Sequence, residues 1–101
     1  MLILPIKKKW FDMIKSGEKK EEYREIKAYY LSRFNKLPLY DFREDKMTFE
    51  VVFRNGYSKS SPKLKCKCKI RIGQGKEEWG AEPNKEYYVL EILEVLEHDR
   101  L

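Results

Sequence analysis

The segment from Lys63 to Ile72 alternates strictly between basic and apolar side chains. Its apolar positions are Leu64, Cys66, Cys68, Ile70 and Ile72. Successive side chains of a β-strand point to opposite faces, so this period of two predicts a strand with one buried face and one solvated face. Any fold for this chain must therefore contain a sheet that covers one side of this segment.

A different period predicts an early helix. Apolar residues recur at offsets of 0, 4, 7 and 8, as on one face of an amphipathic helix. These residues are Ile6, Trp10, Met13 and Ile14. Gly17 follows where such a helix would stop, because glycine adopts the left-handed C-terminal conformation at little cost. We expect a helix from Lys7 to Ser16.

Weaker patterns complete the set of expected elements. Apolar or alternating runs predict further strands, and a moderate 3.6-residue period predicts a second helix. In chain order these elements are the strands Leu2–Leu4 and Lys20–Arg24, the helix Glu25–Lys36, and the strands Met47–Arg54 and Glu86–Leu96. Two helices inserted early among about five strands predict an α+β fold, a small β-barrel with helical insertions.

Composition bounds the organisation of the chain. Its 101 residues are 42% hydrophobic and contain no linker or repeat, which indicates one domain over residues 1–101. No apolar run approaches the roughly 20 residues of a membrane span. Apolar residues precede the Lys7–Lys9 run, the reverse of a secretory signal, so we expect a cytoplasmic protein without a membrane partner. Nothing in the sequence requires more than a monomer.

Charge and cysteine content narrow the partners. The 22 Lys+Arg against 17 Asp+Glu give a net charge of +5, which favours an anionic partner. Cys66 and Cys68 lie too close together to form a disulfide framework. A zinc site needs about four ligands, and His98 is the only histidine. We therefore expect two small buried side chains, with no metal and no cofactor.

The basic side of the alternating segment is a candidate binding surface. Its cations, among them Lys65 and Lys67, would follow one another at about 6.6 Å, twice the rise per residue of a strand. Such a row suits the phosphates of an extended nucleic-acid strand, and replacing Lys65 would mainly flatten the salt dependence of binding. The alternative is a lysine-lined edge strand, whose charges keep sheets from associating.

A second candidate lies in the segment from Gly17 to Arg24. Lys19, Glu22 and Arg24 crowd together where the first helix leads into a strand. Flanking cations keep a partly buried carboxylate ionised, and such a group can grip a phosphate or a base edge. A lysine of lowered pKa can also act as base or nucleophile. The alternative is an ordinary charged strand with surface ion pairs.

The residues Gly17, Lys19, Glu22 and Arg24 match the GxKxxExR signature of the ASCH domain, a branch of the PUA-like superfamily. The preceding helix also resembles the first helix of that family. Three later blocks look like those of small members: Phe53–Ser58, Trp79–Pro83 and Tyr87–Leu90. The similarity extends over nearly the whole chain.

This resemblance implies a PUA-like barrel whose cleft lies beside the signature strand, with Lys19, Glu22 and Arg24 lining it and Gly17 shaping the turn. It also implies RNA as a partner, since relatives in the superfamily bind RNA. Some small ASCH proteins are amidohydrolases of acylated cytidine, and others are reported as ribonucleases. In the amidohydrolases, a lysine equivalent to Lys19 works with a threonine, whose position here is occupied by Glu22.

Other candidates rest on chemistry alone. Arg54, Asn55 and Tyr57 cluster at a turn, where Arg54 could hold a phosphate and Tyr57 could stack on a base. The alternative for Asn55-Gly56 is a hairpin turn. Trp79 is either a stacking platform or a plug over the barrel end. Tyr29 and Tyr30, on the second helix, fit either the cleft or the core.

Two functions from different classes are favoured, and a third possibility is an adaptor that only docks on another protein. The first is a binding module for RNA or a nucleotide, in which Lys19, Glu22 and Arg24 accept a base while Arg54 or Lys65 and Lys67 contact phosphate. The second is a small hydrolase of a modified nucleoside or of RNA. In that case Lys19 would be the base or the activator of the nucleophile, and Glu22 its partner.

Overall fold

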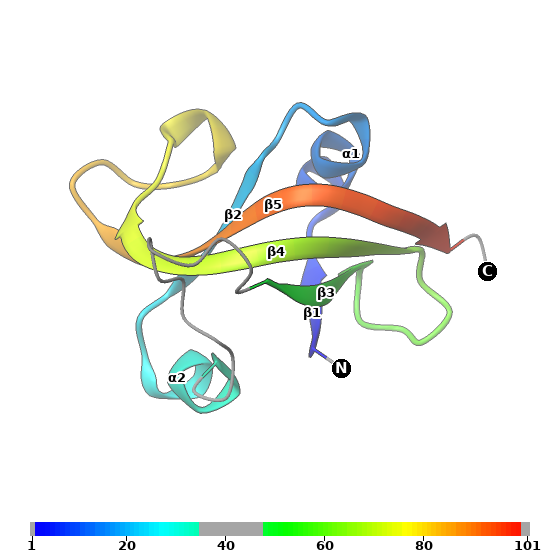
Figure 1. The fold of residues 1–101 in the computed structure, drawn as a ribbon, viewed down its shortest axis with the longest axis horizontal. Coiled ribbons are helices and arrows are strands. Elements are labelled where there is room, and N and C mark those ends of the chain that lie inside the picture. Colours follow the sequence, from blue (N-terminus) through cyan, green and yellow to red (C-terminus); the bar gives the residue numbers. More distant parts are fainter. Residues whose placement is uncertain (1, 35–47, 100–101) are drawn as a thin grey trace.

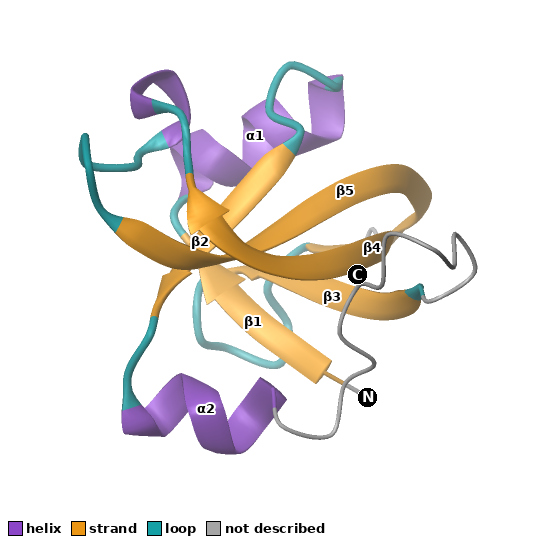
Figure 2. Ribbon diagram, turned by 60° about the vertical axis from the view of Figure 1, so that its left-hand side comes forward, coloured by secondary structure: helices purple, strands orange, loops and turns teal. Residues whose placement is uncertain are grey.

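The computed structural model describes residues 2–34 and 48–99 and has an α+β fold (Figure 1). Its elements are β1 (Leu2–Ile6), α1 (Lys8–Ser16), β2 (Glu21–Glu25), α2 (Ala28–Phe34), β3 (Phe49–Asn55), β4 (Lys63–Gln74), the 3-10 helix η1 (Glu77–Trp79) and β5 (Glu86–Asp99). The strands form one mixed sheet that curls into a half-barrel, with α1 and α2 at opposite ends (Figure 2). The expected α+β class is confirmed.

The order of strands across the sheet is β1-β3-β4-β5-β2. β1 runs parallel to β3, and all other neighbours are antiparallel. Thus β1 and β2, which are joined by α1 in the sequence, become the two edges of the curled sheet. Pro5 lies inside β1, so that strand does not stop at Leu4 as expected. An edge strand tolerates proline because only one of its sides must supply hydrogen bonds.

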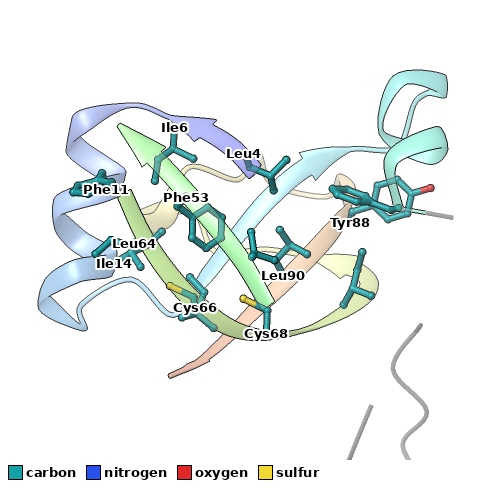
Figure 3. Close-up of a cluster of buried hydrophobic side chains, with 14 residues drawn as sticks. Leu4, Ile6, Phe11, Ile14, Phe53, Leu64, Cys66, Cys68, Tyr88 and Leu90 are labelled. Carbon is teal, nitrogen blue, oxygen red and sulfur yellow. The ribbon is translucent and has the colours of Figure 1, made fainter. Parts of the chain in front are cut away.

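The core lies inside the curl and confirms most of the alternation in β4. Leu64, Cys66, Cys68 and Ile70 are fully buried. They meet Phe11 and Ile14 of α1, Phe53 of β3 and Leu90 of β5 (Figure 3). Ile72 is the exception, because its side chain is 54% exposed near the end of the strand. Alternation fixes the face that a side chain occupies, but not how far the core extends along that face.

The two cysteines behave as buried apolar side chains. Both are free thiols with no exposed area. Burial raises the pKa of the Cys66 thiol to about 12, so this thiol stays protonated at neutral pH. Within residues 2–34 and 48–99, no helix is long and apolar enough to cross a membrane.

The second helix begins later than the sequence pattern predicted. Glu25 still pairs with Tyr87 as the last residue of β2, and α2 starts only at Ala28. Of the two tyrosines of α2, Tyr30 packs against the core while Tyr29 is 55% exposed. The predicted helix end at Lys36 and strand start at Met47 lie outside the described residues.

Candidate functional site

The turn after α1 brings the signature segment beneath the sheet edge. Gly17 has a φ of 87°, and its backbone N–H donates to the carbonyl of Ile14. Two residues later, Lys19 donates its backbone N–H to the carbonyl of Met13 at 2.9 Å. This reversal directs the Lys19 side chain inward, just before β2 begins. A side chain at position 17 would strain the left-handed backbone on which the reversal depends.

Glu22 is the centre of a buried charge cluster that consists of Lys19, Glu22 and Arg24. Its Oε1 lies 3.1 Å from Lys19 Nζ, and its Oε2 lies 2.7 Å from Arg24 Nη2. The three side chains are only 0%, 9% and 11% exposed, respectively. The expected convergence of these residues is therefore present, because Glu22 and Arg24 share one face of β2 and Lys19 reaches them from the turn.

Lys19 lies beneath the cleft instead of opening into it. Its ammonium group donates to the backbone carbonyl of Glu21 and contacts Glu22. The rings of Trp10 and Tyr23 lie 5.2 and 4.9 Å from its Nζ. Burial lowers the pKa of Lys19, and the neighbouring Glu22 opposes that shift. Lys19 is thus placed to hold Glu22 in position.

Arg24 connects the two edges of the sheet. Its Nη2 donates to Glu22 and, at 3.0 Å, to the backbone carbonyl of Pro5 in β1. Its Nη1 donates to the hydroxyl of Tyr30 in α2 at 3.3 Å. Three elements therefore fix the plane of the guanidinium group, and among the described residues its buried Nε has no hydrogen-bond partner.

A cleft of about 520 Å³ opens above this cluster. We call it the cleft; its walls come from the end of β1, the start of α1, β2, the loop to α2 and the turn after β3. The lining residues are Pro5, Ile6, Lys7, Lys8, Trp10, Glu22, Tyr23, Arg24, Glu25, Lys27, Tyr30, Asn55, Gly56 and Tyr57. Cations, carboxylates and aromatic rings are mixed in this lining.

The turn after β3 brings two of the predicted residues to the cleft. Asn55 and Tyr57 both line it, and the Tyr57 side chain is 84% exposed. Arg54 faces a neighbouring hollow and donates from Nε to the carbonyl of Gly56 at 3.2 Å. Asn55-Gly56 does not form a two-residue hairpin turn, since residues 56–62 separate β3 from β4.

Lys65 and Lys67 lie on the sheet's outer face and line neither this cleft nor the neighbouring hollow. β4 pairs with both β3 and β5, so the edge-strand interpretation is wrong. In register, Lys65 lies opposite Glu97 and Lys67 lies opposite Glu94, and Lys65 Nζ is 3.5 Å from Glu50 Oε1. The outer face therefore carries alternating charges in place of a purely basic row.

Two register shifts in the β4–β5 pair make this charge matching possible. They follow Lys65 and Lys67, as at β-bulges. Each gives β5 one extra residue, so glutamates at every third position face cations at every second position. These glutamates are Glu91, Glu94 and Glu97. Their recurrence at every third position is visible in the sequence, but a search for the period of two of a regular strand does not detect it.

Trp79 is buried at the end of the 3-10 helix η1. Its side chain is 9% exposed and lines neither hollow, which favours the plug over the stacking platform. The adjacent Gly80 has a φ of 103°, and a Cβ built there would lie 3.0 Å from the Trp10 ring. The η1 loop thus packs closely against Trp10, the ring that covers Lys19.

Several lining residues were missing from the sequence prediction, namely Lys7, Lys8, Trp10 and Lys27. Trp10 was assigned only to the apolar face of α1, and none of the three lysines was assigned to a binding site. Their positions in the sequence could have indicated them, because Lys7, Lys8 and Trp10 precede the signature segment and Lys27 follows it. Helix starts and strand ends gather at one edge of a sheet when chain reversals are short.

Comparisons of the chain with family models, with curated proteins and with solved structures gave no match. The expected likeness to ASCH domains therefore rests on the sequence alone, on the signature residues and on the blocks that follow them. Independently of that likeness, the geometry of Glu22 and Arg24 indicates what these side chains could bind. A carboxylate and a guanidinium lie side by side at the wall of a hollow and present fixed acceptors and donors.

Proposed function

We propose that this protein is an RNA- or nucleotide-binding domain of the ASCH type, with a PUA-like fold, and that its ligand binds in the cleft beside β2. The observation that carries the proposal is the paired placement of Glu22 and Arg24 at the cleft wall, 2.7 Å apart. A nucleobase presents donors and acceptors side by side along its edge, which such a pair can match. Because both groups are held by further partners, little ordering is left to be done on binding.

The rest of the lining supports the same ligand. Tyr57 offers an exposed aromatic ring, and base–aromatic stacking contributes about 1–3 kcal/mol per base. Lys7, Lys8 and Lys27 add positive charge at the rim, all with exposed side chains. Phosphate contacts of this kind orient a nucleic acid, while contacts to the base edge select it.

A hydrolase is the second candidate, and the lowered pKa of Lys19 is the observation that favours it. A lysine whose pKa is lowered could serve as a base. Its side chain is nevertheless fully buried, and its ammonium already contacts Glu21 and Glu22. A substrate in the cleft would meet Glu22 and Arg24 first. This geometry supports binding over turnover.

The proposal is tested by titrating labelled single-stranded RNA at about 50 and about 200 mM salt. We expect binding at low salt that weakens as salt rises. Tyr57→Ala should weaken binding about 5- to 150-fold, the equivalent of one lost stacking contact. Leu93→Ala, an exposed residue of β5 outside the cleft, is the matched control.

Two results of this experiment would contradict binding without turnover. One is the absence of any RNA binding at low salt. The other is the appearance of shortened RNA, or of a product from acylcytidine, when the same samples are separated by chromatography.

A further inference from the structure

A second hollow of about 610 Å³ adjoins the cleft, and we call it the basic groove. It lies between α2, β1 and the end of β3. Its lining residues are Ile3, Leu4, Pro5, Arg24, Lys27, Tyr29, Tyr30, Arg33, Arg54 and Tyr57. Half of this set also lines the cleft, so the two hollows are continuous around Arg24, Tyr30 and Tyr57.

The charges of the two hollows differ. The cleft lining includes the carboxylates Glu22 and Glu25, whereas the charged residues that the structure describes around the basic groove are all cations. Among the described residues, no carboxylate forms an ion pair with Lys27, Arg33 or Arg54. Within residues 2–34 and 48–99, no carboxylate neutralises their positive charge.

Neutral groups hold these cations in place. Arg54 donates to the carbonyl of Gly56, and the Arg33 guanidinium lies 4.4 Å from the centre of the Tyr29 ring. Lys27 Nζ lies 5.7 Å from the centre of the Tyr30 ring. Contacts with π faces position a cation without cancelling its charge.

Exposed aromatic rings accompany this charge. Tyr29 is 55% exposed and Tyr57 is 84% exposed, and both line the basic groove. Cations that follow a backbone together with aromatic faces that accept any base are the combination by which proteins bind single-stranded nucleic acid. A small inorganic anion would not use such rings.

We propose that the basic groove binds the sugar-phosphate backbone and the neighbouring base of a single-stranded RNA whose first bound base occupies the cleft. This inference rests on the proposed function and specifies its ligand as a chain of at least two nucleotides. Each hollow falls within the roughly 300–1,000 Å³ that accommodates one drug-sized ligand. Arg24, common to both, is placed near the phosphate that links the two nucleotides.

The test compares a mixture of the four nucleoside monophosphates with a random-sequence single-stranded RNA octamer as ligands. Wild-type protein should bind the octamer at least tenfold more tightly than the monophosphates at low salt. In the variant Arg33→Gln/Arg54→Gln this ratio should fall at least tenfold. The salt slope for the octamer should become shallower by about 1.4, which is about 0.7 for each lost phosphate contact.

The variant Lys15→Gln/Lys20→Gln is the matched control, because it removes the same charge from exposed positions that line neither hollow. Its ratio should stay within twofold of the wild-type value. If the groove double variant does not fold, Arg33→Gln alone, at an exposed position, should shift the ratio in the same direction.

The outcomes separate this inference from the proposed function. Monophosphate binding with no gain from the octamer would overturn the groove while the function of the cleft stood. A groove variant whose ratio stays within twofold of wild type would also overturn it. Failure of both ligands to bind at low salt would defeat the proposed function, and this inference with it.

Discussion

The two faces of β2 carry ion pairs formed by neighbouring residues of the sequence, but in very different surroundings. Glu22 points inward and joins Lys19 and Arg24, whose side chains are 0% and 11% exposed. Glu21, its neighbour, points outward and contacts Arg71 at 3.1 Å, with Arg71 33% exposed. One residue of register therefore separates a buried charge cluster from a solvated one, because successive side chains of a strand face opposite ways.

The titration behaviour of the two faces differs in the same sense. Burial lowers the pKa of Lys19 despite the opposing charge of Glu22. Burial also acts to lower the pKa of Arg71, but hydrogen bonds to Glu91 and Glu21 outweigh it and raise the pKa. Desolvation thus dominates inside the sheet, while partners dominate on its outer face. The comparison predicts that the inner pairs matter far more for stability.

The largest effect is expected for Lys19→Met, which keeps a long unbranched side chain but removes the ammonium group. Glu22 would lose one of its two charged partners while remaining buried, which typically costs about 3–5 kcal/mol. The free energy of unfolding, measured by urea denaturation, checks this. Adding Glu22→Gln to the Lys19→Met variant should cost clearly less than Glu22→Gln costs alone. Equal costs would show that the two side chains are not coupled.

A smaller effect is expected for the pH dependence of the free energy of unfolding, compared between the wild-type protein and Lys19→Met. The pKa of Lys19 is lowered in the folded state, so the unfolded chain binds more protons just below the ordinary value of 10.5. The stability that depends on Lys19 should therefore rise as pH increases from the lowered pKa toward 10.5, and it should be lost as pH falls through the lowered pKa. The wild-type free energy of unfolding minus that of Lys19→Met should follow this trend. A difference that decreases with rising pH would contradict it.

The smallest effect is expected for Arg71→Gln on the outer face. Its partners Glu21 and Glu91 stay at least partly hydrated, so the loss should be about 1 kcal/mol or less. Urea denaturation at low and high salt is the measurement, and added salt should reduce the loss further. A loss as large as that of Lys19→Met would remove the distinction between the two faces.

Much of the fold was predictable because it depends on local periodicity. The alternation in β4, the apolar face of α1 and the stop at Gly17 each follow from steric rules that act over a few residues. The start of α2 was wrong, because the backbone pairing of Glu25 with Tyr87 extended β2 at the expense of the helix. That partner lies far along the chain, where a local pattern carries no information.

The candidate site was predictable to the same extent. The convergence of Lys19, Glu22 and Arg24 followed from one turn and one strand, both local. The charge balance around Lys65 and Lys67 did not, because their neighbours belong to β3 and β5 and two register shifts decide which residues face them. The basic groove was missed for the same reason, since its cations come from separate elements.

The hydrogen bond from Arg24 to the backbone carbonyl of Pro5 has a consequence for how the molecule would respond to a bound ligand. β1 and β2 are the two edge strands of the sheet. Within the part of the chain that the structure describes, they form no backbone hydrogen bonds with each other. The Arg24 side chain instead bridges these two edges of the half-barrel. Any ligand that draws on the same guanidinium protons competes with that bridge. Binding of such a ligand would be coupled to the distance between β1 and β2, and therefore to the curvature of the sheet.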